Sequence, residues 1–560
     1  MQVHRKKLRL SSALLVLALG ATACGGGGDE PAGGDAAPEG EAGGEFSLYV
    51  TDPENPLIPS NTTESEGAQV LEPLFTGLAV YDTETSELEM EGVAESIESD
   101  DSKTWTVKLR DWKFHDGTDV TADSFVNAWN FAANSNNAQG ASYFFANIEG
   151  YDALQAEEGQ QVPAGTTLSG LKKVDDKTFT VTLTQPFRQY PVTLGYTAFN
   201  PLPDAFFGAD GQPGTADDKA AQDAFGKKPI GNGPYQVEAD FTPGTGVRLT
   251  RFEDYSGEAK GMADAVDIKV YTDVNTAYTD VQGGNLDIAP DIPPETIETA
   301  PDEFGERFRD RNSSSFTYLG FPTYDDRFAD KKVRQAFSMA IDRKAITDSI
   351  FNGTFDPAYS VISPVVQGHR EDACEFCEYK PDEAKALLAE TDFDTSKPVD
   401  LWFNAGAGHD EWVQAVGNQL RDNLGVQFKL QGGLQFAEYL PKADEKGFTG
   451  PFRLGWGMDY PSPQNYLEPL YSTSALPPNG SNTAFYSNPE FDELVKQGNA
   501  AESDEEAIEI YQQAEDLLLE DLPVAPMFFG KEQWVFSEKV DNVNMDAFGH
   551  VRVSEVTVNQ

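Results

Sequence analysis

The chain has 560 residues, of which 41 are basic and 93 acidic, giving a net charge of -52 at neutral pH. Phosphate groups would be repelled by such a surface, and no local basic patch offsets the repulsion, so nucleic acid is excluded as a partner. Aromatic residues make up 11% of the chain, which excludes a disordered protein, and the length is sufficient for two or three structural lobes.

The first 23 residues have the layout of a secretory signal peptide. Basic residues precede a short apolar run at 10–19, which is too short to span a bilayer, and small residues lead up to Cys24. This segment resembles the lipobox of bacterial lipoproteins, which implies a lipidated Cys24 at the start of the mature chain, although Ala21 stands where leucine is commoner. An ordinary cleaved signal is the alternative. Residues 24–45 therefore comprise the lipidated cysteine and a flexible glycine-rich tether.

From Phe46 onward the chain alternates helix-like and strand-like patterns, which predicts an α/β fold. After Thr121 or Asp123, either of which can cap a helix, the residues Phe125 and Trp129 fall on one helical face. The other predicted helices are residues 67–78 with a kink at Pro73, 333–346, 381–390, 412–423 and 503–520. The predicted strands are residues 104–109, 177–184, 230–237 after a Gly-Pro turn, 246–251, 266–271, 400–403 and 426–430, and residues 522–529 are expected to form a proline-rich exit from the last helix.

Besides Cys24, the chain has two cysteines, Cys374 and Cys377, in a C-x-x-C pattern. Such a pair could form a structural disulfide, a redox centre or half of a zinc site. An oxidising compartment and the lack of a second C-x-x-C favour the disulfide. The acidic, glycine-rich segment 208–218 does not place oxygen ligands at alternate positions, so we expect a loop there and no metal site.

Motifs of catalysis and of nucleotide binding are not found. The chain lacks G-x-S-x-G, H-E-x-x-H and the phosphate-binding G-x-x-x-x-G-K-[ST]. Because catalytic residues are recognised by geometry and not by order, a lipid-anchored hydrolase stays as an alternative. We expect a protein that is not an enzyme and that needs no cofactor.

Nine collinear segments of the chain resemble the oligopeptide-binding protein family, the family 5 extracytoplasmic solute-binding proteins of peptide ABC importers. These segments are residues 71–82, 103–129, 177–187, 230–237, 284–290, 333–346, 379–390, 455–467 and 482–495. The resemblance implies a two-lobed clamp of three domains that closes over its ligand. Domain I would comprise residues 46–72, 226–312 and 534–560, domain II residues 73–225, and domain III, the far lobe, residues 313–533.

The same resemblance implies a set of ligand-binding residues. Asp459 in GMDY matches the aspartate that pairs with the amino terminus of a bound peptide. Trp456, Gly457 and Met458 match a backbone segment that adds the peptide as a strand, and residues 64–68, including Glu66 and Gly67, lie near the opposing backbone contact.

Two further residues match positions that meet the carboxyl end of the peptide in some family members. The guanidinium of Arg453 suits a carboxylate because it can donate two parallel hydrogen bonds. His409 lies in a glycine-rich turn, where a histidine can equally be a packing residue. Members of the family can have a cysteine where Gly457 stands, bonded to one near Ser315, and this chain has neither.

Relatives of such proteins carry nickel complexes, haem or oligosaccharides. The scarcity of histidine, with 5 in the whole chain, argues against nickel and haem. Aromatic platforms leave oligosaccharide as an alternative ligand. The resulting prediction is a monomeric lipoprotein on the outer face of the cell membrane. It would capture oligopeptides and deliver them to the permease subunits of an ABC importer, whose ATPases supply the energy.

Overall fold

A computed structural model describes residues 42–157, 159–211, 213–214, 218–477 and 480–559. The predicted signal peptide, the predicted lipidation site Cys24 and most of the predicted tether lie outside these residues. Within them, no helix combines the length and the apolar character that crossing a bilayer requires. The described residues also contain no cluster of His, Cys, Asp and Glu side chains that could hold a metal ion.

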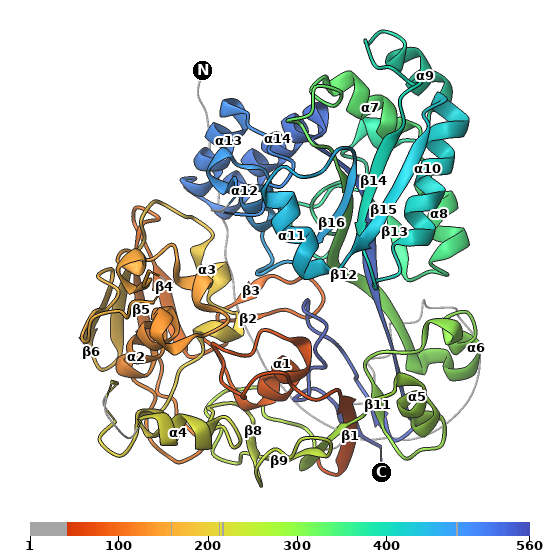
Figure 1. Cartoon of the computed structure of the whole chain (residues 1–560). Helices are drawn as coiled ribbons and strands as arrows, with labels where there is room; N and C mark the ends of the chain where they lie inside the picture. The colour runs from red at the N-terminus through yellow and green to blue at the C-terminus, as the bar shows by residue number, and fades with distance from the viewer. Residues whose placement is uncertain (1–41, 158, 212, 215–217, 478–479, 560) are drawn as a thin grey trace, which may run out of the picture. The chain divides into compact units, whose positions relative to one another are not determined.

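The largest sheet has eleven strands and is shared by the two lobes of the protein (Figure 1). In spatial order its path is β15 (Phe428–Leu434), β14 (Val399–Asn404), β16 (Phe452–Trp456), β12 (Phe308–Gly320), β17 (Val524–Phe536), β11 (Ile288–Ala289), β1 (Glu45–Val50), β10 (Ala265–Val270), β9 (Gly246–Arg251) and β8 (Tyr235–Val237), with β13 (Phe355–Pro357) also paired to β17. Parallel pairs, such as β1 with β10, occur beside antiparallel pairs, such as β12 with β17. The sheet is therefore mixed.

A separate antiparallel sheet lies in the segment expected to form domain II. It contains β4 (Ala94–Glu98), β5 (Thr104–Leu109), β7 (Thr178–Thr182) and β6 (Leu171–Asp175), in this order. Helix α2 (Ala122–Ala133) begins at Thr121, whose side chain forms a capping box with Ser124. Its Trp129 packs edge-on against Phe179 of β7 at 5.5 Å between ring centroids. The strand predicted at 104–109 and the helix predicted after Thr121 are confirmed.

The helices divide between the two lobes. Those of the first lobe are α1 (Ser65–Leu71), α2, α3 (Tyr190–Thr193), α4 (Asp218–Phe225), α5 (Val274–Gln282) and α6 (Ala300–Phe304). Those of the far lobe are α7 (Lys331–Met339), α8 (Arg343–Ile350), α9 (Pro381–Leu388), α10 (Asp410–Leu424), α11 (Phe436–Asp444), α12 (Pro463–Tyr471), α13 (Pro489–Asn499) and α14 (Asp504–Asp521). Two small antiparallel sheets of two strands each complete the structure, β2 (Val80–Tyr81) with β3 (Leu88–Glu89) and β18 (Val540–Asp541) with β19 (Thr557–Val558).

Separate hydrophobic cores define the two lobes. The core of the first lobe draws on residues 46–304 and 534–558, and the core of the far lobe on residues between 316 and 529 together with Ala547. Strands β12 and β17 run through both lobes, as Figure 1 shows, so that Phe316 packs in the far core while Val535 packs in the first. The α/β two-lobed clamp is thus the fold of this chain. One core cluster joins residues 73–225 to the rest of the first lobe, so the three-domain boundaries stay a prediction.

The single helix predicted at 333–346 is wrong. Helix α7 ends at Met339, and a new helix, α8, begins at Arg343. The side chain of Asp342 accepts a hydrogen bond of 2.9 Å from the backbone N–H of Ala345, and this N-cap starts the second helix. An apolar pattern that continues across the break does not reveal it.

The prediction of a proline-rich exit at 522–529 is also wrong, because Val524–Phe536 is the strand β17 near the middle of the sheet. Its register against β12 shifts between the pairs Thr317 with Phe528 and Tyr318 with Pro526. A proline has no N–H to donate to a sheet, and such an irregularity is where a strand tolerates it.

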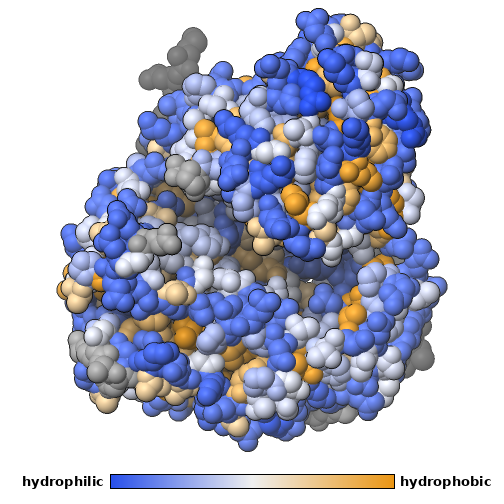
Figure 2. Space-filling model, viewed as in Figure 1, coloured by the Kyte–Doolittle hydropathy of each residue, from blue (hydrophilic) through white to orange (hydrophobic). Residues whose placement is uncertain are grey.

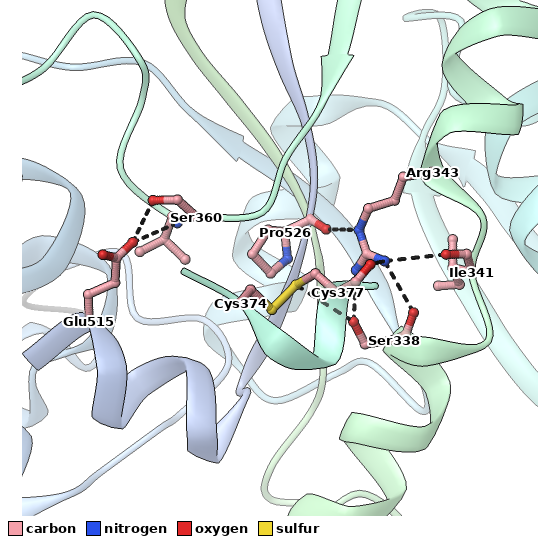
Figure 3. The surroundings of a disulfide bond; sticks show 9 residues. Ser338, Ile341, Arg343, Ser360, Cys374, Cys377, Glu515 and Pro526 are labelled. Atoms are coloured by element: carbon pink, nitrogen blue, oxygen red, sulfur yellow. Dashed lines mark hydrogen bonds between the residues drawn. A yellow bond between two sulfur atoms is a disulfide. The ribbon is translucent and has the colours of Figure 1, made fainter. Parts of the chain in front are cut away.

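Cys374 and Cys377 form a disulfide bond within the far lobe (Figure 3). The buried guanidinium of Arg343 lies beside it and donates to the backbone oxygens of Cys377, at 2.8 Å, and of Pro526, at 2.6 Å. It also donates to the hydroxyl of Ser338 at 2.7 Å. Arg343 therefore ties the cysteine loop to helix α7 and to strand β17.

Candidate ligand-binding site

A cavity of about 470 Å³ is lined by residues of both lobes. The first lobe contributes residues from α1 and the following segment to Tyr81, and the C-terminal residues 546–554; the far lobe contributes Ser314 and the segment Gly457–Asp459. Figure 2 shows the surface hollowed between the lobes on the face that it displays. The predicted residues Gly457, Met458 and Asp459 thus line a cavity of a size suited to a ligand.

Asp459 is the acidic residue of the far lobe that faces this cavity. It follows β16, and its backbone N–H donates to the side-chain oxygen of Asn465 at 2.8 Å. One carboxylate oxygen accepts from the hydroxyl of Tyr143 at 2.9 Å and the other from the side-chain amide of Asn465 at 3.1 Å. Burial raises the pKa of the Asp459 carboxyl. Both donors are neutral, so the carboxylate keeps the capacity to bind a cation.

Tyr143, which the sequence analysis missed, comes from the opposite lobe. It lies in the 3-10 helix Ser142–Phe145, and 52% of its surface is exposed although its hydroxyl contacts Asp459. Burial of the hydroxyl, and then the charge of Asp459, raise its pKa, so it acts as a hydrogen-bond donor. A tyrosine 316 positions before its partner has no local sequence signal that would connect the two.

The backbone next to Asp459 has a free edge. Strand β16 pairs with β12 over Phe452–Trp456, but on its other side only Phe452 is paired, with Trp402 of β14. Gly457 is exposed, and a Cβ added there would approach nothing closer than Ser314 Oγ at 3.8 Å. Trp456 does not line the cavity, and its indole N–H donates to Asn465 at 3.2 Å. An extended chain could therefore pair with the open edge of β16.

Arg453 and His409 lie away from the cavity but close to each other. The guanidinium of Arg453 donates to Asn404 at 3.3 Å, while its Nε is buried without a hydrogen-bond partner among the described residues. His409 Nδ1 accepts from Trp412 at 3.3 Å, which leaves Nε2 as the donor, and this atom is likewise buried and unpartnered there. Burial, and then the charge of Arg453, lower the pKa of His409 to about 4. The pair is suited to an anion.

The segment 64–68 is placed at the cavity, though not as an extended strand. Helix α1 begins at Ser65, and Glu64, Ser65 and Ala68 line the cavity. Glu66 does not, and its carboxylate accepts from the hydroxyl of Thr51 at 2.9 Å. Gly67 does not either: it packs so closely that an added Cβ would lie 2.4 Å from a methyl group of Thr62.

A largely buried group of charged residues, here called the floor cluster, adjoins the cavity in the first lobe. Its members are Glu72, Arg311, Glu532, Asp546, His550 and Arg552. Three ion pairs connect them: Glu72 with Arg552 at 2.8 Å, Asp546 with His550 at 3.3 Å and Glu532 with Arg311 at 3.2 Å. Burial raises the pKa of both glutamates to about 7. No sequence pattern singled out these residues.

These features, a two-lobed α/β fold with a cavity between its lobes, define the class of solute-binding proteins. Residues 90–477 match the family "Bacterial extracellular solute-binding proteins, family 5 Middle", and the chain belongs to this family. It is similar to the periplasmic oligopeptide-binding protein OppA of Salmonella typhimurium, with 30% identity over 475 residues and 81% of each chain covered. The oligopeptide-binding protein OppA of Bacillus subtilis is 25% identical, with 98% of each chain covered.

Solved structures have the same fold. The unliganded open form of the periplasmic murein tripeptide-binding protein MppA matches with a TM-score of 0.79 and 23% identity, covering 93% of this chain and 99% of that one. Haemophilus influenzae OppA in complex with the peptide RPPGFSPFR matches with a TM-score of 0.67 and 21% identity, covering 93% of this chain and 100% of that one. The expected family and fold class are confirmed.

Proposed function

We propose that the protein captures oligopeptides between its lobes and delivers them to the permease of an ABC importer. The carboxylate of Asp459, which is half-buried at the cavity and bonded by neutral donors, is the observation that carries the proposal. A peptide ammonium would complete its hydrogen bonding with a charge-assisted bond. The relatives named as oligopeptide-binding proteins support this choice of ligand.

The rest of the ligand would follow strand β16. Its open edge offers backbone groups to a peptide backbone, and Arg453 with His409 would bind the terminal carboxylate. Arg453 and Asp459 are separated by at most about 20 Å, since an extended chain rises about 3.3 Å per residue. Such a span suits a short peptide with both termini charged.

Replacing the carboxylate tests the proposal. In an Asp459→Asn variant we expect peptides with a free amino terminus to bind about ten-fold to a hundred-fold more weakly, because a hydrogen bond to a charged group contributes about 1.5–3 kcal/mol. Peptides with an acetylated amino terminus should lose little affinity, since they bring no ammonium group to position 459. Isothermal titration calorimetry with both peptides measures the difference, and equal losses for the two would refute the role of Asp459.

The nature of the ligand can also be examined directly. Native mass spectrometry of the purified protein should reveal co-purified peptides of several masses, which dissociate intact because the protein acts as a receptor and not as a hydrolase. An oligosaccharide in their place would favour the alternative ligand, for which the aromatic side chains lining the cavity could supply stacking surfaces. Peptides recovered as cleavage fragments would favour the hydrolase.

The anchor is proposed from the sequence alone. Lipidated Cys24 and the glycine-rich residues that follow it would hold a monomeric receptor near the permease at high effective concentration. The predicted domains I, II and III would then move as the clamp closes. A Cys24→Ala protein should appear in the medium or the soluble envelope fraction. Retention of that variant in the membrane fraction would contradict the anchor without affecting the proposed clamp.

A further inference from the structure

The cavity beside Asp459 has strongly acidic walls. Six acidic side chains border it, those of Glu64, Glu72, Glu91, Glu258, Asp459 and Asp546. Among the lining residues that the structure describes, only Arg552 and His550 are basic, and each is already paired with an acid, at 2.8 Å to Glu72 and 3.3 Å to Asp546. Glu64 is held by the amide of Asn55 at 3.0 Å. The walls therefore keep an excess of negative charge.

Aromatic rings form another part of these walls, beside small polar and aliphatic residues. Tyr143 stacks on Phe144 at 4.6 Å, Phe144 on Tyr196 at 4.3 Å, and Tyr196 meets Phe548 at 5.6 Å. The lining members of this row, Tyr143, Tyr196 and Phe548, extend from Asp459 to the floor cluster. The faces of aromatic rings carry negative potential and attract cations, as carboxylates do.

The position of the cavity decides which part of a peptide enters it. In an amino acid the Cβ atom lies about 2.5 Å from the amino nitrogen, so the first side chain begins next to Asp459. The backbone would continue along β16 toward Arg453, which does not line the cavity. The space is thus left to the first side chain.

We infer that this cavity selects a cationic first side chain, lysine or arginine, in the ligand. The inference rests on the proposed function. An apolar side chain would strip water from the carboxylates and hydroxyls of the walls without replacing the lost hydrogen bonds. An acidic side chain would add repulsion, whereas an ammonium or guanidinium group satisfies both the carboxylates and the ring faces.

Four peptides of similar size test the inference in calorimetric titrations at 150 mM salt: Lys-Ala-Ala, Ala-Ala-Lys, norleucine-Ala-Ala and Glu-Ala-Ala. The first two have the same net charge and differ only in where the cation lies, so attraction by the acidic protein as a whole cannot separate them. We expect Lys-Ala-Ala to bind about ten-fold more tightly than Ala-Ala-Lys and norleucine-Ala-Ala, and Glu-Ala-Ala to bind most weakly. Equal binding of all four would overturn the inference alone, and binding of none would overturn the proposed function as well.

Variants locate the preference in the cavity. Glu91 and Glu258 lie in its wall and are exposed, so their replacement by glutamine preserves the fold. We expect the double variant E91Q/E258Q to reduce the ratio of affinities for Lys-Ala-Ala and norleucine-Ala-Ala about three-fold. The matched control is E445Q, at an exposed acid next to α11 and outside the cavity, which should leave the ratio unchanged. An unchanged ratio in E91Q/E258Q, or an equal reduction in E445Q, would refute the assignment to this cavity.

Discussion

The guanidinium of Arg453 is a mostly buried charge that could bind an anionic group of the ligand. Its guanidinium is mostly buried and contacts the neutral amide of Asn404, and burial lowers its pKa. Burying a cation beside neutral groups costs free energy, which a ligand carboxylate would recover on binding. The neighbouring His409 is neutral, so its N–H can donate to the same anion without adding a competing charge.

We therefore expect an Arg453→Met variant to lose about ten-fold to a hundred-fold in affinity for peptides with a free carboxyl terminus. Peptides with an amidated carboxyl terminus should bind nearly as before, because they bring no charge to this site. Arg453 is mostly buried and forms no ion pair with the residues that the structure describes, so its replacement by methionine should leave the melting temperature the same or raise it.

Titration calorimetry and thermal melts measure both effects. Arg421→Met, at an exposed arginine on α10, serves as the control and should change neither the peptide affinities nor the melting temperature. A lowered melting temperature together with equal losses for both kinds of peptide would show that Arg453 is structural.

At the level of single residues, the sequence pointed to Asp459 and Arg453 only through resemblance to a family. Spacing could not have found Tyr143, because its contact with Asp459 joins the two lobes across 316 positions. The floor cluster was not predictable for the same reason. Glu72 and Arg552 are far apart in the chain, and only the fold brings them together as a shielded ion pair.

Among the elements, those with strong local signals were predictable. The capping residues Thr121 and Ser503 begin α2 and α14 as expected. The break between α7 and α8 was not, since the apolar face continues across Asp342 and only the folded chain shows that its carboxylate caps a second helix. Strand β17 was not predictable because it contains Pro526. A strand accepts proline where its pairing is irregular, and the position of such an irregularity depends on the partner strand, here β12.

The floor cluster connects four elements, and its ionisation should make stability depend on pH. Glu72 lies in the 3-10 helix after α1, Arg311 on β12, Glu532 on β17, and Asp546 in the C-terminal segment. Burial alone would lower the pKa of His550, but the negative charges of Asp546, Glu72 and Glu532 outweigh burial and raise it. For Asp546, burial would raise the pKa, but His550 and Arg552 lower it to about 2. Tyr255 and Glu555 also face Arg552.

Glu72 and Glu532 should make the fold less stable as pH rises. A carboxyl group whose pKa rises from 4.5 to about 7 on folding stabilises the fold below pH 4.5, and this contribution is lost as pH rises through 7. His550, with a raised pKa, acts in the same direction. His115 and His409, whose pKa values fall to about 4 on burial, act in the opposite direction, but only below their unfolded pKa of about 6.5.

We therefore expect the melting temperature to fall between pH 6.5 and pH 8. Each pKa unit corresponds to about 1.4 kcal/mol, so each glutamate contributes about 3 kcal/mol over the whole range from pH 4.5 to pH 7. Only the last part of this contribution, about 1 kcal/mol or less for each glutamate, is lost above pH 6.5. Thermal melts across this range check the trend. In a Glu532→Gln variant the slope should be smaller, whereas Glu445→Gln should retain the wild-type slope. A melting temperature that rises with pH, or an identical slope in Glu532→Gln, would be inconsistent with this assignment.

At the scale of the whole molecule, the net charge of -52 opposes folding through repulsion between acidic groups. Salt should relieve the repulsion because the screening length falls to about 10 Å at 0.1 M. Most ion pairs of the described residues join partly exposed side chains, whose loss on screening costs little. We expect the melting temperature to rise as sodium chloride increases from 20 to 500 mM at constant pH. A steady fall would mean that ion pairs outweigh the repulsion.

The passage of β12 and β17 through both lobes also sets the order in which the chain can fold during synthesis. Strand β11 of the first lobe pairs with the end of β17, Ile288 opposite Phe536, and residues 540–558 pack into the same core as Phe46. The far lobe lies between these parts of the chain. Because synthesis proceeds from the amino end, the lobe that the ribosome begins first is the one that is completed last.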